Sequence, residues 1–166
     1  HRVDRRQRQM CIRDRLMTFE QIRAIVIGRM QQWAGIPAED VDLEPNGDTP
    51  FDPAGRAIWA RLADIPGLSS TPEVGIGPCV RQTGIVVIQL FVPSYSGTLA
   101  ITRAVDTLVA QFQHYSAPEG PFDFFEASPQ VVGDDGNNWY QVNVRVPYRA
   151  YCCLLYTSDA ADDLLC

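Results

Sequence analysis

An almost unbroken apolar run in the middle of the chain limits the folds that this sequence can adopt. Residues 85–92 read Ile-Val-Val-Ile-Gln-Leu-Phe-Val, and Pro93 follows directly. The run is too rich in β-branched residues for a helix, and its composition is typical of a strand in the centre of a sheet. We therefore expect a central strand that ends at the proline.

A second strand, with only one apolar face, is predicted over residues 139–148. Apolar residues alternate there with polar ones, as they do in a half-buried strand. Asp135 and Gly136 precede it and predict a tight turn from residues 122–132, which are aromatic and β-branched. Pro129 in that segment indicates a bulge or an edge position. The one face holds Tyr140, Val142, Val144 and Val146, and the other holds Trp139, Gln141, Asn143 and Arg145.

Two amphipathic helices are predicted. The first covers residues 18–34, where apolar residues recur every three or four positions and Thr18 forms a capping box with Gln21. The second runs from about Ile101 and closes near Pro118, and its apolar stripe needs a sheet to cover. The order of elements predicts an α+β domain in which two helices pack on one face of a mostly antiparallel sheet.

The remaining segments predict one more strand and two long connections. Residues 37–55 hold four of the twelve prolines, which favours turns, with a short edge strand around Val41. A weak alternation over residues 58–63 predicts a half-buried strand. Residues 66–78 are rich in Pro, Gly and Ser and are longer than most connections in a compact domain. We expect a loop there that binds a partner or moves.

The charge balance argues against a surface that grips nucleic acid. The 166 residues, the size of one domain, hold 14 basic residues, all arginine, against 20 acidic ones, for a net charge of −6. No stretch reaches the roughly 18 uninterrupted apolar residues that a membrane span needs, and no secretory signal is visible. The default compartment is therefore the cytoplasm.

The two ends differ in composition from the middle. Residues 1–16 carry six Arg and two Asp, and residues 152–166 carry three Asp and three Cys. The strings RQMCIRDR and CCLLYTSDAADDLLC resemble peptides translated from sequencing-adapter DNA in metagenomic assemblies, and we interpret both ends as artefacts or disordered extensions. A basic arm and a short C-terminal helix of a real protein are the alternative. We expect the native domain to cover residues 17–151 and to start at Met17.

The middle of the chain offers few residues for nucleophilic catalysis. It holds one cysteine, Cys79, and one histidine, His114, so neither a disulfide scaffold nor the ligand spacing of a transition-metal site is present. A Cys79–His114 dyad is conceivable. The ordinary interpretation is that His114 stabilises the C-terminus of the second helix and that Cys79 is a small apolar residue.

Acidic residues give no stronger signal. Asp123, Glu126, Asp134 and Asp135 are the nearest cluster for glycosidase-type catalysis, and the last two for calcium. The turn already explains the Asp pair, and the alternating ligand loop of a calcium site is absent. A P-loop is absent too, and residues 75–77 lack the third glycine of a dinucleotide fingerprint. We expect no catalytic, cofactor-binding or metal-binding residues.

Three segments resemble the tail-terminator-like proteins of long-tailed bacteriophages. They are the start MTFEQIRAIVIGRMQQWAG, the centre RQTGIVVIQLFVPSYSGT and the end NNWYQVNVRVPYRAY. The strongest parts are the strand that ends in Phe91-Val92-Pro93 and the last strand, which closes at Val146-Pro147. These are fold signatures rather than catalytic motifs.

The resemblance implies a structural virion protein rather than an enzyme. Such proteins form a ring, commonly a hexamer, on the head-proximal end of the tail tube. The tail is assembled in the host cytoplasm and becomes part of the virion. The implied partners are other copies of the chain, the major tail tube protein and the head–tail connector protein. Genomic DNA is only passing cargo, which the acidic charge suits, and no membrane is involved. Another head–tail connector or neck protein and a small enzyme are the alternatives.

The predicted loop after the 58–63 strand is the candidate oligomer or tube interface. Its apolar residues Leu68, Val74 and Ile76 stand among few charges, as in a contact surface. Arg61 and Arg81 beside it could reach acidic groups of an adjacent subunit, for at most about 1 kcal/mol each. The alternative is that the apolar side chains fold back on their own core.

Overall fold

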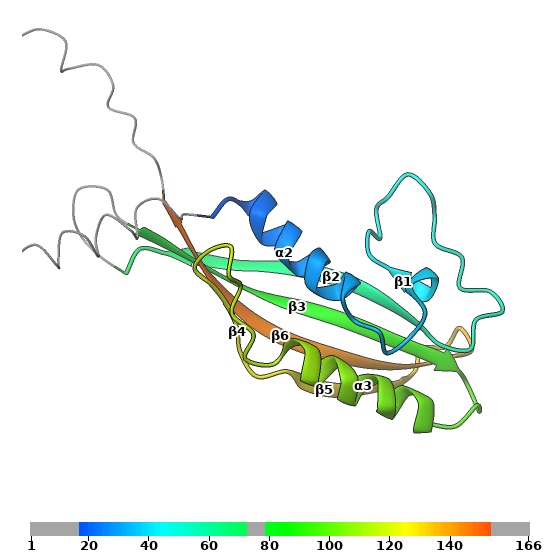
Figure 1. Ribbon diagram of the computed structural model, residues 1–166. Coiled ribbons are helices and arrows are strands. Elements are labelled where there is room, and N and C mark those ends of the chain that lie inside the picture. The colour runs from blue at the N-terminus through cyan, green and yellow to red at the C-terminus, as the bar shows by residue number, and fades with distance from the viewer. Residues whose placement is uncertain (1–16, 73–78, 154–166) are drawn as a thin grey trace, which may run out of the picture.

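The computed structural model describes residues 17–72 and 79–153. They form one sheet with both helices on the same face, which confirms the predicted α+β fold (Figure 1). The helical elements are α2 (Phe19–Gln31), a 3₁₀ turn (Ala38–Asp40) and α3 (Leu99–Phe112). The strands are β1 (Val41–Asp42), β2 (Trp59–Ser70), β3 (Cys79–Pro93), β4 (Phe122–Phe124), β5 (Ser128–Asp134) and β6 (Trp139–Cys153).

The sheet has the order β1-β2-β3-β6-β4, and β5 also pairs with β6. Only the β1–β2 pair is parallel. The strand predicted over residues 85–92 is confirmed as central, because β3 pairs with β2 on one side and with β6 on the other. Its pairing with β6 runs from Cys79 opposite Cys153 to Pro93 opposite Trp139. β6 thus continues two residues past the predicted domain end at 151, and the nature of the ends stays a prediction.

Alternation along the strands gives the sheet two different faces. On β3 and β6 the even-numbered side chains point to the helices, and Val86, Ile88, Leu90, Val144 and Val146 are completely buried there. Residues in register across the strands share a face. We call this side the helix-covered face and the opposite side the helix-free face. The predicted one-sided pattern of the last strand is confirmed.

The capping box at the start of α2 is confirmed, since Thr18 and Gln21 exchange backbone and side-chain hydrogen bonds. The helix ends at Gln31 rather than at 34. Trp33 leaves the helical path, and its indole N–H donates to the Thr107 hydroxyl of α3 at 2.9 Å. Arg29 also ties α2 to α3, because its Nε donates to the carbonyl of Gln111 at 2.9 Å.

The loop predicted over residues 66–78 is wrong for its first part, because β2 continues to Ser70. A register shift between Pro66 and Ser69 absorbs the irregular sequence. Buried Gln82 forms hydrogen bonds with two residues of that bulge. Its side-chain amide donates to the carbonyl of Gly67 at 3.0 Å, and its side-chain oxygen accepts from the Ser69 hydroxyl. The end of the predicted loop, 73–78, lies outside the described residues.

The predicted edge position of Pro129 is confirmed, because it lies in β5, which among the described strands pairs only with β6, whereas the break that separates β4 from β5 lies at residues 125–127. β4 pairs with β6 through residues 122–124, and β5 pairs with β6 from Ser128 onward. A second register shift lies between Val131 and Gly133, where Gly133 has a positive φ of 92°. β5, and β2 where it runs beyond its short pairing with β1, form edges of the sheet, and each carries a proline and a bulge.

Candidate functional site

Besides Phe19 at the start of α2, large apolar side chains are exposed in two places on opposite sides of the sheet. Ile65 and Leu68 lie on β2, and Leu68 is 90% exposed. Around the turn before α3 and along β5, four more are exposed: Tyr95, Leu99, Val131 and Val132. Beside this second group, a groove of about 350 Å³ lies between α3 and β5 and is lined by apolar Ile101, Val105 and Val131. Surfaces of this kind are typical of contacts with other proteins.

The predicted interface residues are only partly described. Leu68 is exposed, as a contact residue would be, whereas Val74 and Ile76 lie outside the described residues. Arg61 is already paired within its own chain, since its Nε donates to Asp42 at 3.0 Å. Among the described residues, Arg81 donates to the Ser70 hydroxyl at 3.3 Å.

The helix-free face carries more positive than negative charge. Arg61, Arg81, Arg145 and Arg149 stand at alternate positions of β2, β3 and β6 and share this face by register. Two aspartates lie with them, and each is paired: Asp42 with Arg61, and Asp123 with Arg149 at 3.1 Å. Within the described part of the chain, Arg81 and exposed Arg145 form no ion pair.

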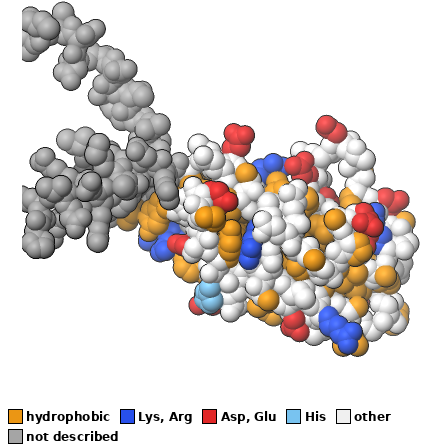
Figure 2. Space-filling view, in the orientation of Figure 1, with side chains coloured by type: hydrophobic (Ala, Val, Ile, Leu, Met, Phe, Trp, Pro, Cys, Tyr) orange, Lys and Arg blue, Asp and Glu red, His pale blue; other side chains and the backbone are white. Residues whose placement is uncertain are grey.

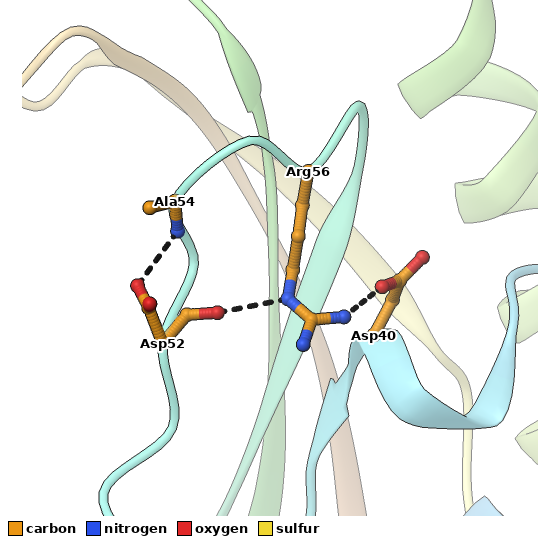
Figure 3. Close-up of polar contacts among 4 residues, drawn as sticks. All are labelled: Asp40, Asp52, Ala54 and Arg56. Atoms are coloured by element: carbon orange, nitrogen blue, oxygen red, sulfur yellow. Dashed lines mark hydrogen bonds and ion pairs between the residues drawn. The ribbon is translucent and has the colours of Figure 1, made fainter.

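The loop between β1 and β2 has the opposite charge. Among its exposed residues are Glu44, Asp48 and Asp52, and Figure 2 shows acidic side chains gathered over this loop. Arg56 fixes the loop from inside, as Figure 3 shows: it pairs with Asp40, and its Nε donates to the backbone carbonyl of Asp52 at 2.8 Å. The Asp52 carboxylate in turn accepts from the Ala54 N–H at 2.9 Å. The acidic surface is thus held in a defined shape.

Two carboxyl groups have perturbed pKa values. The Ser116 hydroxyl, at 2.7 Å, and the Arg149 guanidinium hold the pKa of Asp123 below its usual value. Burial raises the pKa of Asp64, against the opposing effect of a hydrogen bond from the Tyr148 hydroxyl. Tyr148 reaches Asp64 across the central strand at Gly84, where a Cβ would stand 2.3 Å from the tyrosine ring. Asp123 thus serves an ion pair, whereas Asp64 is a half-buried carboxyl hydrogen-bonded to a tyrosine.

Among the described side chains, no hydrogen bond or ion pair joins two of the residues considered for catalysis. His114 is exposed at a positive φ of 56° just after α3, and the side chain of Cys79 is outside the described part. Asp134 and Asp135 accept backbone N–H groups of the turn that follows them. Among residues 17–72 and 79–153, no three His, Cys, Asp or Glu side chains are grouped to hold a metal ion.

The sequence analysis did not single out Arg145, Arg149 or the acidic loop. The signal for the arginines was present, because the alternation of the last strand puts Arg145 opposite the valine face. That they share a face with Arg81 depends on the register between the strands, which could not be predicted from the sequence. None of the helices in the described ranges is long and apolar enough to span a membrane.

Comparisons with known proteins identify the family of the chain. The model of a family described as "Phage tail terminator protein" matches residues 21–148. One solved structure, which carries no functional description, has a TM-score of 0.59 and 18% sequence identity, and the alignment covers 81% of this chain and 96% of that one. At this identity the likeness shows the fold alone. No curated protein matches the sequence.

Proposed function

The chain belongs to the phage tail terminator proteins, and from this premise we propose that it forms a ring on the head-proximal end of the tail tube. The family is one of structural phage proteins, so the chain is a virion component. In the proposed role the ring ends tube polymerisation and then contributes to joining the tail to the head. The observation that carries the proposal is the family match over most of the domain.

The exposed surfaces are compatible with several simultaneous protein contacts. A subunit in a closed ring needs two different patches for its two neighbours, and it needs further surfaces for the tube and the connector. The chain exposes apolar side chains on both sides of the sheet, at Leu68 and around Val131. The proposed partners are further copies in a hexamer, the major tail tube protein and the head–tail connector protein, with DNA passing through the lumen.

We keep the segment around Leu68 as the proposed oligomer or tube contact, together with Val74, Ile76, Arg61 and Arg81. Leu68 supports it by its exposure, and Arg81 by having no ion pair among the described residues. Arg61 contributes less, because Asp42 already engages it. Exposed charge pairs of this sort stabilise an interface by at most about 1 kcal/mol.

Tube assembly in the presence of the protein tests the function. Purified major tail tube protein from the same genome is allowed to polymerise with and without this chain, and the tubes are measured by electron microscopy. The proposed function predicts tubes that stop elongating and carry a ring at one end. Binding to the connector without any effect on tubes would instead assign the chain to the other neck proteins. A Leu68→Asp variant that still caps tubes would remove Leu68 from the contact.

A further inference from the structure

The charges of this protein are separated between two surfaces. The chain as a whole is acidic, with a net charge of −6, yet the helix-free face holds four arginines and two aspartates, both of them paired. Arg81 and Arg145 are left without an acidic partner in the described part of the chain. This face therefore favours a negatively charged partner.

The acidic loop between β1 and β2 is anchored by Arg56 and has the complementary charge. Two exposed carboxylates of the loop, on Asp48 and Asp52, form no ion pair among the described residues, and neither does exposed Glu39 in the 3₁₀ turn just before β1. The loop projects beyond β1 (Figure 1), and its Phe51 packs on Trp59 of β2, which in turn stacks on Phe91 of β3. Because Arg56 already holds its backbone, docking costs little conformational entropy.

We propose that the acidic loop of one copy docks on the helix-free face of the next copy, where its free carboxylates face Arg81 and Arg145. The inference rests on the proposed ring and names the surfaces that join its subunits. Loop and face are different parts of the chain, so the contact is head-to-tail, the type of contact that closes rings. Each copy contributes its loop to one neighbour and its sheet face to the other.

A protein partner suits this face better than DNA does. Between the arginines lie apolar side chains, among them Ile65, which is 54% exposed, and half-buried Ile85 and Val87. Arginine among apolar side chains with few free acids is the composition of a protein interface. Phosphate contacts make no use of apolar groups, and the net charge of the chain repels DNA.

Charge reversal on either surface tests the contact. Arg145→Glu and the double variant Glu39→Arg/Asp48→Arg are each compared with the parent by light scattering over a range of concentrations. Each should raise the concentration of half-assembly by about tenfold or more, because like charges then face one another. Mixing the two variants should restore assembly, since the intact surfaces pair with each other and the two reversed surfaces again have opposite charges. The oligomeric mass of the parent should also fall as the salt concentration rises.

Matched controls separate the contact from general charge effects. Arg103→Glu changes an exposed arginine of α3 on the opposite side, and circular dichroism reports whether each variant is folded. Unchanged assembly of folded Arg145→Glu would overturn the proposal. So would binding of duplex DNA by the parent that Arg145→Glu abolishes while its mass stays the same. If Arg145→Glu lowers the oligomeric mass but the parent does not cap tubes, the proposed contact is supported and the proposed function is wrong.

Discussion

Side chains that point to the helix-covered face and to the helix-free face alternate along the same strands, but the two sets differ in burial. On β3, Ile88 is completely buried under the helices, whereas its neighbour Val87 is only half-buried on the helix-free face. On β6, Val144 is completely buried and Arg145 is exposed. The difference teaches that the helix-covered face holds most of the core, whereas the helix-free face is buried where Trp59 stacks on Phe91 and leaves Arg145 in solvent.

The largest effect should come from truncating the helix-covered face. Ile88→Ala removes buried methyl and methylene groups and should lower the free energy of unfolding by about 3 to 4 kcal/mol. Val87→Ala, one position away on the opposite face, should cost about 1 kcal/mol, because its side chain is already partly in water. Urea unfolding followed by circular dichroism measures both. Equal losses at the two positions would show that the helix-free face is also part of the core.

The next largest effect is expected at Gly84, where the Tyr148 ring lies across the central strand. Gly84→Ala places a Cβ 2.3 Å from the tyrosine ring and should destabilise the fold by about 2 to 3 kcal/mol. Gly28→Ala is the control, since no atom lies within 4 Å of its added Cβ in α2 and helix propensity favours alanine by about 1 kcal/mol. Thermal unfolding of both variants should therefore shift in opposite directions. A neutral Gly84→Ala would mean that Tyr148 is free to leave its place.

These elements also show how much of the molecule could be predicted from the sequence. Alternation predicted the buried face of the last strand, and apolar content predicted the central strand. Pro66 and Gly67 looked like a loop, because local propensity does not reveal that Gln82, fifteen residues further on, satisfies the bulge. Leu68 could be proposed as exposed from composition alone. The packing of both helices on the same face is a property of the tertiary structure. The exposed surface around Arg145 could therefore not be predicted from the sequence.

A smaller effect should follow from Asp64 on the helix-covered face. Its folded pKa is raised, so the folded state binds this proton more tightly than the unfolded state does, and the ionised carboxylate destabilises the fold. That destabilisation is complete above the folded pKa and is relieved as the pH falls through it. Asp64→Asn should therefore unfold at a higher temperature than the parent at pH 7, with the difference shrinking toward pH 4. A difference that grows toward low pH would reverse the assignment.

The smallest effect is expected on the helix-free face itself. Arg145→Ala should change the free energy of unfolding of the unassembled chain by no more than about 0.5 kcal/mol, because the side chain is exposed and has no ion pair among the described residues. Chemical unfolding at a concentration below assembly measures it. A loss above 1 kcal/mol would give this arginine a role in the fold and erase the contrast between the faces.

The proline and bulge on each outer strand have a consequence for chains that have not yet found a partner. Pro66 and Pro129 donate no backbone hydrogen bond, and the register shifts beside them twist both edges. A strand of another molecule finds no straight row of N–H and C=O groups to extend. Edge-to-edge pairing of free copies, the first step toward cross-β fibres, is therefore disfavoured along β2 and β5.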